Sequence, residues 1–167
     1  MAGRAPTPRT RSGSGRRGRF AVVASRFNEP IVKKLVDGAV EAFTAGGVPA
    51  QAVDVYWVPG SFELPLAAQH LVRSKRYAGI ACVGVVIKGE TPHFDYVAGE
   101  AAAGIRTVAL TAAVPVTFGV ITALTEAQAW ARAGGSVGNR GAEAAEAALE
   151  MADFLAAPAP GRRPRRE

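Results

Sequence analysis

Residues 79–87 read GIACVGVVI and form the most strongly apolar run in the chain. A short continuous apolar run of this kind is typical of a strand that is buried on both faces, as the strands of parallel sheets are. We therefore expect this stretch to be a central strand of a parallel sheet.

Shorter apolar runs flank this stretch and alternate with helical patterns. Strands are predicted at residues 20–24, 52–58 and 115–121. Helices are predicted from Asn28, which can cap the first of them, to Gly46, and at residues 62–75, 94–112, 125–133 and 140–155. The order βαβαβαβαα predicts an α/β fold, a three-layer αβα sandwich with a four-stranded parallel sheet of the flavodoxin-like kind.

The charge of the chain is concentrated at its two ends. The 167 residues suit one domain and carry a formal net charge of +6. Residues 1–19 hold six Arg and no acid, and residues 156–167 hold four Arg and one Glu, so the body between them is mildly acidic. We expect disordered basic tails at residues 1–18 and 156–167 around a domain at 19–155. The tails would either solubilise the protein or bind a polyanion without sequence specificity.

Composition argues against several classes of protein. No run of 18 or more apolar residues is present, so no membrane-spanning helix is expected. A single Cys excludes a disulfide framework, and with two His it argues against a Cys/His metal cluster. No apolar segment of a secretory signal follows the basic N-terminus, so we expect a cytoplasmic protein. Cys82 and Asp54 are interpreted as structural residues.

Polar and aromatic residues follow three of the predicted strands, in residues 25–28, 59–63 and 88–93. The carboxyl ends of parallel strands meet at one edge of a sheet, where ligands bind, so we expect these loops to converge on one crevice. Phe27 and Phe62 could stack on a flat ring or cap the core. His93 could move protons or be an ordinary first-turn residue. Backbone N–H groups after Lys88 would suit an anion.

Five blocks of sequence, taken in order, resemble one enzyme family. They are residues 25–28 (SRFN), 58–65 (VPGSFELP), 84–97 (GVVIKGETPHFDYV) and 115–122 (PVTFGVIT), followed by Gln128 with residues 132–134 (RAG) and 138–145 (GNRGAEAA). Over about residues 19–155 the chain resembles the 6,7-dimethyl-8-ribityllumazine synthases of riboflavin biosynthesis. The resemblance implies a transferase that condenses 5-amino-6-ribitylaminouracil with 3,4-dihydroxy-2-butanone 4-phosphate, releases phosphate and water, and uses no metal or organic cofactor.

The resemblance also assigns roles to residues by matching position. His93 would be the acid/base, and Arg132 would hold the phosphate as it leaves. The implied substrate-binding residues are Phe27, Asn28, Ser61, Phe62, Glu63, Val86, Ile87, Lys88, Gly89, Glu90, Thr91, Phe118, Arg140 and Glu143. In this family the active site lies between subunits, and Phe118 would reach in from the neighbouring one.

Members of the family assemble as homo-oligomers, and the short glycine loop at residues 134–141 resembles the loop in shell-forming members. A pentamer or a 60-mer icosahedral shell is therefore expected, with riboflavin synthase as a candidate partner. The chain departs from the family at Arg140, where Lys is usual, and at Ala123 and Leu124, where a polar pair is usual. The alternative functions are a flavin- or lumazine-binding paralogue and a shell-forming scaffold, each with weak catalysis.

Overall fold

The computed structural model describes residues 18–157, and the predicted tails lie outside these residues except for residue 18 and residues 156 and 157. The strands are β1 (Arg19–Ser25), β2 (Val53–Val58), β3 (Tyr77–Ile87), β4 (Val116–Ala123), β5 (Ala133–Gly135) and β6 (Gly138–Asn139). The α-helices are α1 (Glu29–Ala45), α2 (Leu64–Arg73), α3 (His93–Ala112), α4 (Glu126–Ala131) and α5 (Arg140–Ala156). Two 3₁₀ turns, η1 (Ala50–Ala52) and η2 (Ser61–Glu63), precede β2 and α2.

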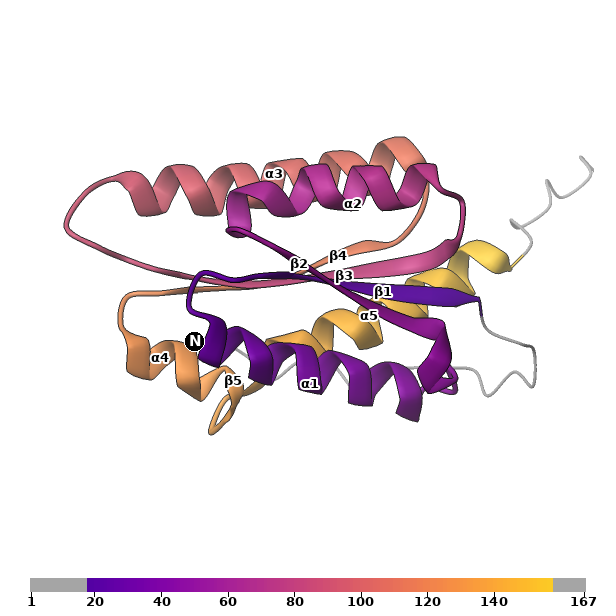
Figure 1. Cartoon of the computed structure of the whole chain (residues 1–167), viewed down its shortest axis with the longest axis horizontal. Helices are drawn as coiled ribbons and strands as arrows, with labels where there is room; N and C mark the ends of the chain where they lie inside the picture. The colour runs from indigo at the N-terminus through magenta and orange to yellow at the C-terminus, as the bar shows by residue number, and fades with distance from the viewer. Residues whose placement is uncertain (1–17, 158–167) are drawn as a thin grey trace, which may run out of the picture.

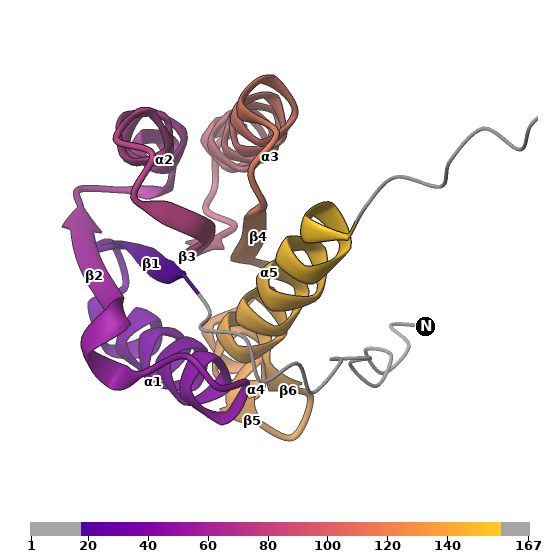
Figure 2. The same ribbon diagram turned by 90° about the vertical axis from the view of Figure 1, so that its right-hand side faces the viewer.

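The predicted fold class is confirmed. Four parallel strands form one sheet in the order β2-β1-β3-β4, which matches the first four strands of a flavodoxin-like sheet. Helices α2 and α3 cover one face of this sheet, whereas α1, α4 and α5 lie on the other (Figures 1 and 2). As expected, β3 is internal, and it is almost wholly buried from Tyr77 to Val85.

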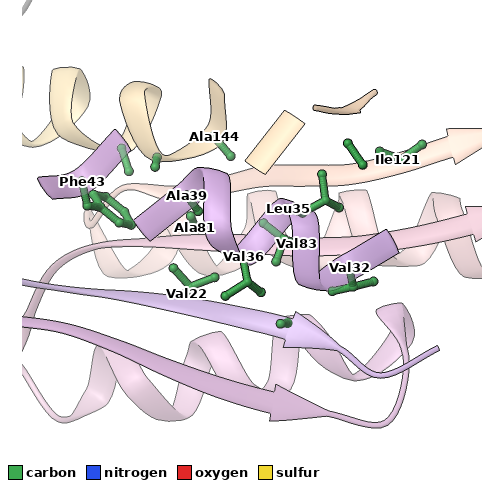
Figure 3. Packing of buried hydrophobic residues seen from close by; sticks show 14 of the residues in the cluster. Val22, Val32, Leu35, Val36, Ala39, Phe43, Ala81, Val83, Ile121 and Ala144 are labelled. Carbon is green, nitrogen blue, oxygen red and sulfur yellow. The ribbon is translucent and has the colours of Figure 1, made fainter. Parts of the chain in front are cut away.

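Two hydrophobic clusters hold the three layers together. On one side of the sheet Val22, Val83 and Ile121 pack with Leu35 and Phe43 of α1 and with α5 (Figure 3). On the other side, alternate residues of the same strands pack against α2 and α3; they include Ala21, Val23, Ile80, Cys82 and Val120. Each fully buried Val, Leu, Ile or Phe side chain contributes about 1.5–3 kcal/mol, so both helical layers are needed to keep the sheet out of water.

Helices α1 and α5 approach each other so closely that one contact point requires glycine. A Cβ atom at Gly141, in the first turn of α5, would collide with the Leu35 carbonyl of α1. Neighbouring support comes from Asn139, whose side chain accepts hydrogen bonds from the N–H groups of Gly141 and Ala142 and donates one to the Lys34 carbonyl. Asn139 thereby caps α5 and ties it to α1.

Some of the predicted details were wrong. Asn28 occupies the N-cap position of α1, but it has a left-handed backbone (φ 59°) and its side chain makes no cap. Instead, its amide donates to the Val85 carbonyl at 3.4 Å. Residues 62–75 form a shorter helix preceded by η2, and the glycine loop contains the unpredicted hairpin of β5 and β6. Arg132, predicted within a helix, is the residue that follows α4.

Arg19 was counted with the basic N-terminal segment, but it is the first residue of β1 and belongs to a polar network. Its guanidinium donates to both oxygens of Asp54, at 2.6 and 3.2 Å, and the Tyr77 hydroxyl donates to Asp54 Oδ2 at 2.7 Å. The hydrogen bonds from Arg19 lower the pKa of Asp54, although partial burial opposes this shift. Burial and the hydrogen bonds with Tyr56 and Asp54 raise the pKa of Tyr77. The structural interpretation of Asp54 is thus confirmed.

The Asp54 network predicts a pH-dependent stability. A carboxyl group whose pKa is lowered in the folded state stabilises the fold above its unfolded pKa, and the effect is lost as pH falls through the folded value. Asp54→Asn should therefore lower the denaturation midpoint at pH 7, and the difference from the parent should shrink below about pH 4. Denaturation of both proteins across this pH range measures it. Lys33→Gln, which breaks the exposed Glu29–Lys33 pair, is the control and should change little at any pH.

The helix crossing predicts opposite effects for two glycine substitutions. Gly141→Ala should destabilise the protein by about 3 kcal/mol, since the methyl group must push the backbones of α1 and α5 apart. Gly99→Ala is the matched control, because a Cβ atom there meets nothing within 4 Å and alanine has the higher helix propensity. Urea denaturation compares the two variants, and equal destabilisation would contradict the close crossing.

Candidate active site

The carboxyl ends of β1, β2 and β3 open into a cleft of about 760 Å³. It is bounded by the loop that follows each strand and by the first turn of α3. The residues that line it are Phe27, Asn28, Pro59, Gly60, Ser61, Phe62, Glu63, Val85, Val86, Ile87, Gly89, Thr91, His93, Phe94, Tyr96 and Val97. The predicted convergence of the three strand-end loops is therefore confirmed.

Backbone hydrogen bonds join the loops beneath the cleft. The N–H of Arg26 donates to the Val58 carbonyl at 2.8 Å, and the N–H of Phe27 donates to the Pro59 carbonyl at 3.2 Å. These bonds continue the β1–β2 pairing past the end of the sheet. On the other side, the N–H of Lys88 donates to the Ala123 carbonyl at 2.9 Å. The walls of the cleft are thus extensions of the parallel sheet rather than independent loops.

Two phenylalanine rings stand exposed at the cleft. Phe27 is 71% exposed and Phe62 is 57% exposed, so neither ring caps the hydrophobic core. Of the two interpretations left open by the sequence, this geometry favours stacking on a flat ligand. Val86 and Ile87 at the end of β3 add a half-buried apolar floor.

His93, Gly89 and Thr91 lie together where the loop after β3 enters α3. His93 is exposed and is the first residue of this 20-residue helix. The positive end of the helix dipole and the N–H groups of the first turn make such a place suitable for an anion. Glu63, at the end of η2, supplies a carboxylate to the same cleft.

Six of the predicted site residues do not line the cleft of the single chain: Lys88, Glu90, Phe118, Arg132, Arg140 and Glu143. Lys88 and Glu90 are exposed neighbours of Gly89 in the connecting loop. Phe118 projects from the edge strand β4 with 43% of its surface exposed. Arg132 donates to the Gln128 carbonyl at 3.0 Å, and Arg140 pairs with Glu143 in the first turn of α5.

The cleft also contains residues that were not predicted as site residues, including Val85, Phe94, Tyr96 and Val97. Tyr96 and Val97 follow His93 by three and four positions, so they share its face of α3. This helical spacing is the signal that could have identified them. Pro59 and Gly60 were noted as part of the loop after β2, but no role was assigned to them.

Cys82 was interpreted as a structural residue, and its surroundings confirm this. Cys82 is fully buried in β3, and burial raises the pKa of its thiol to about 12, so it is a structural residue rather than a nucleophile. Within residues 18–157 no group of three or more His, Cys, Asp or Glu side chains is arranged to hold a metal ion. None of the helices in that part of the chain is long and apolar enough to span a membrane.

A model of the family described as 6,7-dimethyl-8-ribityllumazine synthase matches residues 17–156. The match covers most of the chain and includes every element of the sheet and both helical layers. The three strand-end loops that build the cleft all lie within it. The chain therefore belongs to the 6,7-dimethyl-8-ribityllumazine synthase family, the enzymes that form lumazine in riboflavin biosynthesis.

Proposed function

We propose that the cleft binds 5-amino-6-ribitylaminouracil and 3,4-dihydroxy-2-butanone 4-phosphate and condenses them to 6,7-dimethyl-8-ribityllumazine. The observation that carries this proposal is that Phe27, Glu63 and His93, from three separate strand ends, line one cleft. An aromatic ring, a carboxylate and an imidazole suit a planar, amine-bearing heterocycle whose reaction requires proton transfers.

The pyrimidine would lie against Phe27, with Val86 and Ile87 beneath it. Exposed aromatic rings gain by covering a flat ligand, because both surfaces leave water. Ser61, Phe62 and Glu63 would then hold the pyrimidine and the ribityl chain through backbone and side-chain hydrogen bonds. Asn28 stands beside this position, where its bond to the Val85 carbonyl keeps it at the cleft.

The phosphate of the second substrate would bind at the start of α3, near Gly89, Glu90 and Thr91. No Lys or Arg is among the cleft-lining residues of the single described chain. A leaving phosphate dianion needs positive charge, so we infer that the site is completed by a neighbouring copy that brings Arg132 and Phe118, and Arg140 with Glu143. Arg132 would hold the phosphate by bidentate hydrogen bonds. A shared site requires an oligomer, and we propose the pentamer of this family, alone or within a 60-mer shell.

In the reaction the amine of the pyrimidine attacks the ketone of the second substrate and water leaves, which forms a Schiff base. Phosphate is then eliminated, the ribitylamino nitrogen closes the second ring, and a further water is lost. His93 would donate and accept the protons of these steps. Since both substrates are reactive, holding them in the right orientation would supply much of the rate.

The proton-transfer role of His93 predicts a selective loss of turnover. His93→Ala should lower kcat by roughly 100-fold, while binding of the lumazine product, followed by its fluorescence, stays within about threefold. Turnover with both substrates is followed by lumazine absorbance. The matched control is His70→Ala, because His70 is the other histidine and lies on α2 outside the cleft. Lumazine or flavin binding without turnover by the parent protein would instead indicate a binding paralogue.

The two-chain site predicts complementation between two impaired variants. Arg132→Ala should raise KM for the phosphorylated substrate by about 10–100-fold, since it removes the phosphate clamp. When Arg132→Ala and His93→Ala proteins are dissociated, mixed in equal amounts and reassembled, roughly a quarter of the sites should regain both groups if neighbours pair at random in a ring. The control is Arg73→Ala, at the far end of α2. If the mixture shows no recovered activity although sedimentation shows mixed oligomers, the shared site is wrong.

A further inference from the structure

Two buried hydroxyl groups lie beneath the cleft without hydrogen-bond partners. Within residues 18–157, Ser25 and Ser61 are the two polar residues that are buried, with 0% and 3% of their surfaces exposed. Neither Oγ atom has a hydrogen-bond partner in the part of the chain that the structure describes. A buried hydroxyl without a partner costs free energy, so a pair of them at one place requires an explanation.

Both hydroxyls converge on the space above one glycine of β3. A Cβ atom built at Gly84 would lie 2.7 Å from Ser25 Oγ and 2.6 Å from Ser61 Oγ. Ser25 ends β1 beside Gly84, since the preceding residues Ala24 and Val83 are paired in the sheet. Ser61 reaches the same space from η2, which packs over β1 and β3. The two oxygen atoms therefore fill the volume that a side chain at Gly84 would occupy.

This packing unit lies directly under three walls of the cleft. Ser61 itself lines the cleft, and Phe27 follows Ser25 by two residues. Val85 and Val86, which also line the cleft, are the next residues after Gly84. The height of η2 above β3 thus sets how far Ser61 and Phe62 stand from the floor formed by Val86.

We propose that Ser25, which no assignment above places in the site, is a positioning residue whose hydroxyl props η2 above Gly84 and so sets the width of the pyrimidine pocket. The name of the bound substrate in this inference rests on the proposed function. We infer that this hydroxyl acts by its volume, because it fills the space above Gly84 and has no hydrogen-bond partner within residues 18–157. Removing it leaves space above Gly84 into which Ser61 and the rest of η2 can sink.

The first test separates positioning from folding. Ser25→Ala should raise KM for the pyrimidine substrate, and the Kd of the fluorescent lumazine product, by about fivefold, while kcat changes less than about twofold. The thermal midpoint should stay the same or rise, because the hydroxyl that is removed has no partner to lose. Val23→Ala is the matched control: it lies two residues earlier on the same face of β1, and it should lower the midpoint without changing KM.

The second test replaces the hydroxyl group on β1 with a methyl group on β3. Gly84→Ala alone should raise KM and lower the thermal midpoint, since its methyl group lies too close to both hydroxyls. Combined with Ser25→Ala, the methyl group occupies the space of the missing oxygen and clashes only with Ser61 Oγ, so the KM of the double variant should rise by less than the two single effects combined. Such a non-additive result is expected only of groups that share one space.

Three results would overturn the inference: an unchanged KM and Kd in Ser25→Ala, a rise in KM that is matched by a fall in the thermal midpoint, or additive effects on KM in the double variant. If the parent protein neither turns over the substrates nor binds lumazine, the proposed function fails instead. A crystal structure of Ser25→Ala then decides the positioning question. Movement of residues 61–63 toward Gly84 supports the prop, and an unmoved turn refutes it.

Discussion

Burial of β3 on both faces is the constraint on which the other features of the structure depend. Its apolar side chains alternate between two clusters, so helices must cover both sides of the sheet. Parallel strands joined by such helices all end at the same edge. The parallel topology alone therefore brings the loops after β1, β2 and β3 together. The cleft is a consequence of how helices cover the central strand.

The features that were predictable from the sequence are those encoded by local pattern. The apolar runs predicted the four parallel strands and their helices, because burial on both faces leaves a continuous apolar signal. Asn28 and Arg19 were misjudged for one reason, which is that their partners are distant in sequence. Asn28 bonds to the carbonyl of Val85, and Arg19 bonds to Asp54. Local propensity describes a cap or a basic segment, but it does not contain such tertiary contacts.

The candidate site likewise contains residues that the sequence pattern could predict and residues that it could not. Residues such as Phe27, Glu63 and His93 follow strands, so topology alone gathers them. Phe118 belongs to β4 and Arg132 directly follows α4, and neither residue lines the cleft. The roles proposed for them come from the family resemblance, because neither residue lies in a loop that follows a cleft-forming strand. The helical face that carries Tyr96 could have been recognised from its spacing to His93.

The amino and carboxyl edges of the parallel sheet differ in how their polar side chains are hydrogen-bonded. At the amino ends of the strands, Arg19, Asp54 and Tyr77 satisfy one another with hydrogen bonds that favour the folded state. At the carboxyl ends, Ser25 and Ser61 are buried without hydrogen-bond partners among residues 18–157, and Phe27 exposes its ring to solvent. Such local departures from good packing are expected at a ligand-binding site. Polar and aromatic groups that already have partners within the chain are not available to bind a ligand. The amino edge thus stabilises the fold, while the carboxyl edge leaves Phe27 and other cleft-lining groups available to a ligand.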